Sequence, residues 1–139
     1  MARIISIDYG KKRCGIAVSD PLQIIATGLT TVPSDNLIHF LKQYFSQEEV
    51  SEAIIGYPTN LDNTATDISA KVEKFYNQFQ KIFPAIPVHL VDERFTSKMA
   101  SRAILESGLK KKDRQDKGLV DEVSAVILLQ GYMQSKQHL

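Results

Sequence analysis

The segment ARIISIDYGKKRCGIAVSD, residues 2–20, decides the fold because it holds two apolar runs separated by a short polar turn. The apolar runs, residues 2–7 and 13–18, predict two buried strands. The connection at residues 9–12 is short enough for a hairpin. We therefore predict that the two strands pair antiparallel and begin a larger sheet.

The turn between these strands carries the first candidate functional residues. Asp8 ends the first apolar run, and Lys11, Lys12 and Arg13 follow within five residues. Aspartate is common where a strand meets a tight turn, so Asp8 alone is equally well explained as a turn residue or as a ligand. The turn is accordingly either simply solvated or built to handle phosphate or metal.

The remainder of the chain predicts an α/β domain, because apolar strands alternate with amphipathic helices. The further strands are expected at residues 24–32, 53–56 and 88–91, and the helices at 36–47, 66–83, 97–107 and 120–133. Strands that alternate with helices usually pair in parallel. The prediction is a single domain, residues 1–139, with a mixed five-stranded sheet. Three antiparallel strands come first, parallel strands follow, and helices cover both faces.

Two local features of the helices are also predicted. Ser34 is a suitable N-cap for the helix at residues 36–47. In the last helix, the residues with the spacing of a packed face are Val123, Val126, Ile127 and Gln130.

The composition is that of a globular protein from a reducing compartment. Apolar residues make up 43% and charged residues 24% of the 139 residues, both ordinary values for one domain with a core. Cys14 is the single cysteine, so no internal disulfide can form, and we expect a small core residue rather than a nucleophile. No apolar run suits a membrane-spanning helix, and the N-terminus does not resemble a signal peptide. We expect a cytoplasmic protein without a membrane partner.

Positive charge is concentrated in residues 94–117, although the whole chain has a net charge of only +1. Its eight basic residues are Arg94, Lys98, Arg102, Lys110, Lys111, Lys112, Arg114 and Lys117, against the three acids Glu106, Asp113 and Asp116. Such a segment can bind nucleic-acid phosphates. A charge run is, however, more often a solvated surface.

Three carboxylates are predicted to meet at one edge of the sheet. Asp8 and Glu93 each follow an expected strand, and Asp121 opens the last helix. Sites in open α/β sheets form beyond the carboxyl ends of the strands. Two carboxylates about 4 Å apart repel by about 4 kcal/mol at an effective dielectric of 20, so a cluster favours a divalent cation. Oxygen ligands suit Mg²⁺ or Mn²⁺, and a carboxylate-held metal pair is typical of phosphodiester hydrolysis.

Each of these carboxylates also has a structural alternative. Glu93 could form an exposed ion pair with Arg94, and Asp121 could be a first-turn acid favoured by the helix dipole. Glu122 and Asp92 are the rival ligands in register. The sequence leaves open whether Asp121 or Glu122 is the third ligand.

Four segments together resemble the YqgF family. They are IDYGKKRCGIAVSDP at 7–21, IIGYPTN at 54–60, DERFTS at 92–97 and KGLVDEVSAVILLQ at 117–130. Members are described as Holliday-junction resolvases or as pre-16S rRNA nucleases. The resemblance spans essentially the whole chain, with the four motifs in the right order and spacing.

The resemblance implies an RNase H-like fold and a divalent-metal-dependent nuclease. It implies that Asp8, Glu93 and Asp121 are catalytic residues that hold Mg²⁺ or Mn²⁺. Nucleic-acid binding is expected at the basic turn and the basic segment, at Lys11, Lys12, Arg13, Arg94, Lys98, Lys110, Lys111, Lys112, Arg114 and Lys117.

The leading hypothesis is an endonuclease that matures the 5′ end of pre-16S rRNA, free or on the ribosomal subunit. A second hypothesis is a resolvase of four-way DNA, which needs a homodimer because its cuts are symmetrical; monomer and homodimer both remain open. A third is a non-catalytic nucleic-acid-binding module. Nucleotide binding of the actin type is disfavoured, because it uses two such domains and this chain has room for one.

Overall fold

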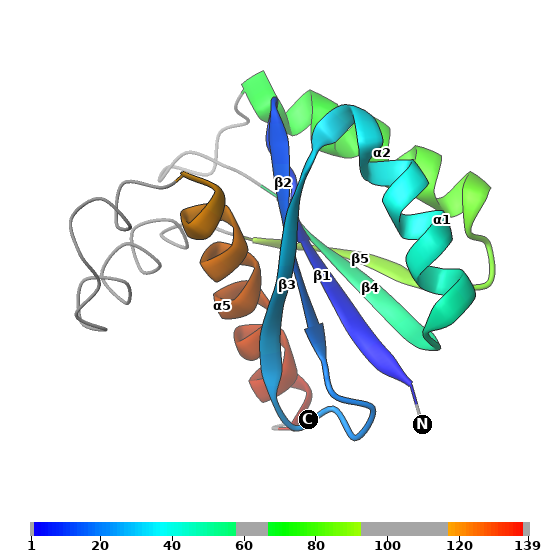
Figure 1. The fold of residues 1–139 in the computed structure, drawn as a ribbon, viewed down its shortest axis with the longest axis vertical. Helices are drawn as coiled ribbons and strands as arrows, with labels where there is room; N and C mark the ends of the chain where they lie inside the picture. Colours follow the sequence, from blue (N-terminus) through cyan, green and yellow to red (C-terminus); the bar gives the residue numbers. More distant parts are fainter. Residues whose placement is uncertain (1, 58–66, 93–116, 138–139) are drawn as a thin grey trace.

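The computed structural model describes residues 2–57, 67–92 and 117–137, which form one sheet flanked by helices (Figure 1). The five strands lie in the order β3-β2-β1-β4-β5. Their bounds are Arg3–Asp8 (β1), Arg13–Ser19 (β2), Ala26–Pro33 (β3), Val50–Tyr57 (β4) and Val88–Asp92 (β5). The helices are α1 (Leu37–Gln47), α2 (Asp67–Ile82) and α5 (Lys117–Gln137), and a 3₁₀ turn, η1 (Ser34–Asn36), precedes α1.

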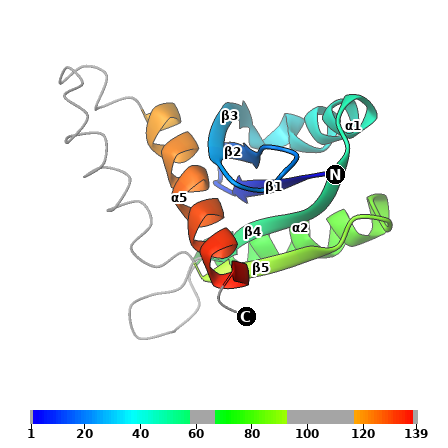
Figure 2. The same ribbon diagram turned by 90° about the horizontal axis from the view of Figure 1, so that it is seen from below.

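The strand pairing confirms the predicted mixed sheet. β2 pairs antiparallel with both β1 and β3, whereas β4 pairs parallel with β1 and with β5. The carboxyl ends of β1, β4 and β5 therefore lie at the same edge of the sheet. Helices α2 and α5 both begin near that edge, on opposite faces (Figures 1 and 2).

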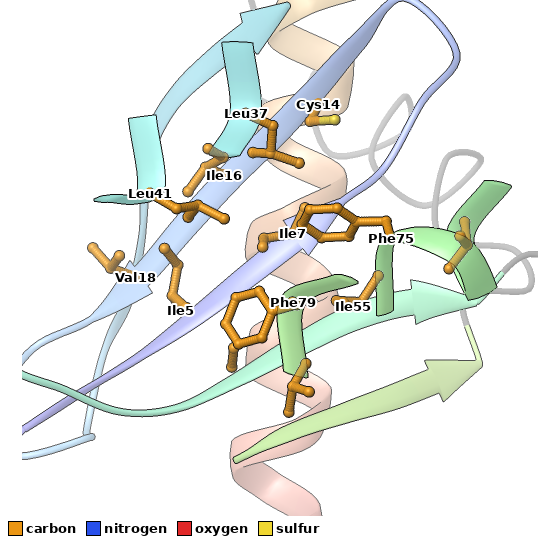
Figure 3. Close-up of a cluster of buried hydrophobic side chains, with 13 residues drawn as sticks. Ile5, Ile7, Cys14, Ile16, Val18, Leu37, Leu41, Ile55, Phe75 and Phe79 are labelled. Carbon is orange, nitrogen blue, oxygen red and sulfur yellow. The ribbon is translucent and has the colours of Figure 1, made fainter. Parts of the chain in front are cut away.

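One face of the sheet is covered by α1 and α2 (Figure 2). Ile5 and Ile7 of β1 pack there against Leu41 of α1 and Phe75 and Phe79 of α2, all buried (Figure 3). Burying one such side chain contributes about 1.5–3 kcal/mol. This layer therefore supplies most of the apolar core and fixes the faces of β1.

The opposite face is covered by α5 alone among the described residues. Ile4 of β1 and Ile54 of β4 pack against Ala125 and Leu129 of the helix. The hydroxyl of Ser6 donates a hydrogen bond of 2.9 Å to the carbonyl of Ala125. Because this group is buried, the bond fixes α5 at one position along β1.

Of the four residues in the predicted packing face of α5, only Val126 packs against the buried cluster on that side of the sheet. Gln130 is exposed, and Val123, Val126 and Ile127 are only half-buried. The buried residues are Ser124, Ala125, Leu128, Leu129 and Met133. The run from Val123 to Leu129 is apolar almost all round, so its periodicity does not reveal which stripe faces the sheet.

The predicted cap at Ser34 is also wrong. Helix α1 begins at Leu37 with Asn36 as its N-cap, and no side chain caps it. Ser34 lies in η1, and its hydroxyl donates to Gly10 instead. The predicted helix at residues 97–107 lies outside the described residues. In the ranges that are described, no helix is long and apolar enough to cross a membrane.

Glu52 of β4 anchors the last turns of α5 to the sheet. Its side chain is 13% exposed. It accepts hydrogen bonds from the hydroxyl of Tyr132 at 3.1 Å and from Nζ of Lys136 at 2.5 Å. Burial, reinforced by the charge of Glu52, raises the pKa of Tyr132 to about 12.

This anchor predicts a loss of stability in alkali. The folded state favours the neutral phenol. Its contribution to the free energy of unfolding is therefore complete below the ordinary pKa of 10.0 and is lost between pH 10 and about 12. Urea unfolding between pH 9 and 11 should show that the wild type loses stability more steeply than Tyr132→Phe. Equal slopes for the two proteins would contradict the burial of the Tyr132 phenol beside Glu52.

Candidate active site

Asp8 faces α5 because side chains alternate along β1. Ile5 and Ile7 pack toward α1 and α2, whereas Ser6 bonds to Ala125 on the α5 face. Asp8 is two residues beyond Ser6 and therefore shares that face. It ends the strand at the carboxyl edge of the sheet.

Gly15 brings the first turns of α5 next to Asp8. It is the register partner of Asp8 across the β1–β2 pair. A Cβ at Gly15 would lie 2.0 Å from the carbonyl oxygen of Asp121. The helix backbone thus rests directly on β2, and Asp8 and Asp121 come to the same edge on the same face. The prediction that their carboxylates form one metal site stays a prediction.

Arg13 joins the basic turn to the helix. Its Nε donates to Oδ2 of Asp121 at 2.7 Å, with the two side chains 34% and 28% exposed. This charge-assisted bond fixes the direction of the Asp121 carboxylate. A hollow of about 330 Å³ lies beside the pair, lined also by Gly10, Lys11 and Lys12. Three cationic side chains and a carboxylate therefore share one open surface.

Ser34 holds the basic turn in shape. Its hydroxyl donates to the carbonyl of Gly10 at 2.6 Å, and its backbone N–H donates to the carbonyl of Lys12 at 3.0 Å. Both acceptors belong to the turn, so Ser34 restricts the positions that Lys11 and Lys12 can take. The sequence analysis missed this role, and no local pattern signals a contact across 24 residues.

Cys14 is a core residue, as predicted. It is fully buried among apolar side chains. Burial raises the pKa of its thiol, although the Ser34 hydroxyl at 3.4 Å lowers it. The thiol form is therefore favoured, and Cys14 is unsuited to act as a nucleophile.

The structure separates the rival carboxylates from Asp8. Glu122 lies over β3, where a Cβ at Gly28 would come 2.4 Å from its Oε1. Asp92 ends β5, which β4 separates from β1 in the sheet, and it lines a hollow with Ile127, Leu128 and Tyr132 of α5. Neither rival shares the position of Asp121, so the geometry favours Asp121 over Glu122 as the third metal ligand.

Several predicted residues cannot be placed beside this site. Glu93 is the residue after β5 and lies outside the described residues, as do Arg94, Lys98, Lys110, Lys111, Lys112 and Arg114. Lys117 is the first residue of α5, and its side chain is not described. In the described parts of the chain, no three His, Cys, Asp or Glu residues gather as a metal site. The three-carboxylate arrangement therefore stays a prediction that depends on Glu93.

Comparison with known proteins agrees with the fold and the motifs. The family model described as "RuvX: Holliday junction resolvase" matches residues 2–135, almost the entire chain. The chain belongs to the RuvX family. The predicted resemblance to the YqgF family is confirmed by this match, since the two names denote one family.

RuvX relatives of nearly equal length carry a nuclease name. A protein of Bacteroides thetaiotaomicron is 55% identical over 137 residues, which is 99% of each chain, and one of Phocaeicola vulgatus is 52% identical over the full length of both. Each is named "Putative pre-16S rRNA nuclease". Both matches cover the residues of all four motifs, since they span 99% and 100% of this chain.

A solved structure confirms the RNase H-like fold. "T. thermophilus RuvC in complex with Holliday junction substrate" matches with a TM-score of 0.57, covering 99% of this chain and 97% of that chain. The sequence identity is 13%. At this identity the match supports the fold alone.

Proposed function

We propose that this RuvX protein is a metal-dependent endonuclease that hydrolyses phosphodiester bonds in the 5′-end maturation of pre-16S rRNA. The observation that carries the proposal is that Asp121 and the basic turn line one hollow, while Gly15, the register partner of Asp8, lies against the backbone of Asp121. The name of the relatives supports the substrate. A cytoplasmic location belongs to the same proposal.

The donors at this edge fit a hard divalent cation. Asp8 and Asp121 offer carboxylate oxygens on one face, and we take Glu93, directly after β5, as the third carboxylate. Oxygen-only ligands suit Mg²⁺ or Mn²⁺. Such an ion, when bound, supplies an activated water and stabilises the charge on a phosphoryl oxygen.

The residues of the chain would position the substrate phosphate. Arg13 holds the Asp121 carboxylate through Nε, and its other N–H groups are in reach of the adjoining hollow, where they could donate to a phosphate oxygen. Lys11 and Lys12 line the same hollow and would lower the cost of bringing an anionic backbone against two carboxylates. Ser34 fixes the turn before the substrate arrives, so less order must be created on binding.

The second candidate is cleavage of four-way DNA. It is favoured by the description of the matching family as a Holliday junction resolvase. Symmetrical cuts would require two sites in a homodimer. Whether this chain is a monomer or a homodimer is therefore tied to the choice of substrate.

A cleavage panel tests the proposal. The purified protein is incubated with a pre-16S rRNA 5′-leader fragment, an unstructured RNA and a four-way DNA junction, each with Mn²⁺, Mg²⁺ or EDTA. The expected result is metal-dependent cleavage of the leader fragment and weak cleavage of the other two. Cleavage of the junction alone would show that four-way DNA, and not pre-16S rRNA, is the substrate. Binding without any product would show that the protein is a non-catalytic nucleic-acid-binding module.

A further inference from the structure

A second basic hollow lies on the other face of the same hairpin. It has a volume of about 300 Å³ and is lined by Tyr9 and Lys11 of the turn and by Lys71, Lys74 and Gln78 of α2. Alternation along β1 explains its place. Asp8 faces α5, so the next residue faces α2.

The base of this hollow is aromatic and ordered. The rings of Tyr9 and Phe75 stack with their centroids 5.1 Å apart and an interplanar angle of 26°. Phe75 is buried in the core, while Tyr9 is half-buried. Burial raises the pKa of the Tyr9 phenol, so this ring stays neutral beside the lysines. A rigid base of this kind fixes the distance between the turn and α2.

The rim of the hollow is cationic. Lys71 and Lys74 are exposed and one turn apart on α2, so they project from the same side of the helix. Within the part of the chain that the structure describes, neither they nor Lys11 form an ion pair. Asp35 is the only carboxylate among the lining residues that the structure describes. Three lysines against one acid leave a net positive charge.

Among the described residues, Glu73 forms no ion pair with the lysines of this rim. It is next to Lys74 in sequence, but it accepts a hydrogen bond of 2.8 Å from the hydroxyl of Tyr57. The lysines therefore remain available to an anion from outside.

The two hollows share a lining residue of the basic turn. Lys11 lines both the hollow beside Asp121 and the hollow beside α2. A phosphate backbone that leaves the candidate active site and passes over the tip would reach Lys71 and Lys74 next. Evenly spaced phosphates favour a row of lysines rather than one isolated cation.

We propose that the hollow formed by Tyr9, Lys11, Lys71 and Lys74 is a second phosphate-binding site for the substrate RNA. It binds the backbone beyond the scissile phosphate and so orients the strand over Asp8. The inference rests on the proposed function, since it assigns this surface to the same substrate.

The test uses Lys71→Ala/Lys74→Ala with a matched control, Lys42→Ala/Lys81→Ala. The control removes the same charge from exposed lysines of α1 and of the far end of α2. Binding of a fluorescein-labelled pre-16S rRNA leader is measured by anisotropy in EDTA, so that cleavage does not contribute. We expect the affinity to fall about tenfold for the first variant and less than threefold for the control.

The salt dependence provides an independent measurement. Loss of two phosphate contacts should lower the slope of log K against log salt by about 1.4 on single-stranded RNA. The control should keep the wild-type slope. Melting temperatures of both variants should match the wild type, because all four side chains are exposed.

The outcomes distinguish this inference from the function on which it rests. If the wild type binds and cleaves the leader while the two double variants behave alike, the second site is overturned and the nuclease stands. If the loss appears only with a four-way DNA junction as probe, the hollow serves branched DNA and the assignment to RNA is overturned. A wild type that neither binds nor cleaves either probe overturns both proposals.

Discussion

Asp8→Asn is expected to lower the rate of leader cleavage by more than about a hundredfold. Loss of a residue that merely supports a metal ligand costs 10–100-fold, and loss of the ligand itself should cost more. Asparagine has nearly the same shape, so it keeps the end of β1 but removes the charge that a divalent cation needs. The rate is measured with the pre-16S rRNA leader at saturating Mn²⁺.

Glu122→Gln is the matched control for this prediction. It makes the same kind of change one residue from Asp121, but its side chain lies over Gly28 of β3. Its cleavage rate should stay within about twofold of wild type. If Asp8→Asn cleaves as fast as this control, Asp8 is a turn residue and the metal site must be sought elsewhere.

The mixed antiparallel and parallel pairing was predictable because several local signals agreed. The short turn predicted that β1 and β2 pair antiparallel, and the alternation of the later strands with helices predicted the parallel pairs. The packing face of α5 was not predictable, since Val123 to Leu129 is apolar nearly all round. There the choice of face depends on the backbone contact at Gly15 and the buried bond of Ser6.

The sequence predicted the basic turn that lines the hollow and proposed the carboxylates of the candidate site. Asp8 and Asp121 follow from the ends of elements, and the family motifs name them together. Ser34 was taken for a helix cap, because its partners Gly10 and Lys12 belong to a distant turn. Lys71 and Lys74 look like ordinary solvated helix residues until the fold places Tyr9 and Lys11 against them.

The close approach of α5 to β2 predicts that Gly15→Ala destabilises the protein strongly. The added Cβ would lie 2.0 Å from the carbonyl oxygen of Asp121 and 2.7 Å from the amide nitrogen of Glu122. These are backbone atoms, so no side-chain rotation relieves the clash and the helix must move. We expect the free energy of unfolding to fall by about 3 kcal/mol, at the upper end for overpacking.

Gly131→Ala is the control, because it adds the same methyl group within α5 where nothing lies within 4 Å. It should raise the free energy of unfolding by about 0.5–1 kcal/mol. Both variants are compared with wild type by urea unfolding. A Gly15→Ala protein as stable as wild type would mean that α5 does not rest on β2.

Gly15→Ala also tests whether cleavage depends on the position of α5 as well as on the identity of the ligands. Any Gly15→Ala protein that still folds has Asp121 moved away from Asp8, and a displacement of about 1 Å costs on the order of a hundredfold in rate. Its cleavage should therefore fall although every predicted ligand is present. The nearest atoms to a Cβ at Gly28 all belong to the side chain of Glu122 rather than to backbone, so Gly28→Ala should change stability and cleavage much less than Gly15→Ala. If both glycine variants lose activity equally, the site depends on the sheet as a whole rather than on the contact between Gly15 and Asp121.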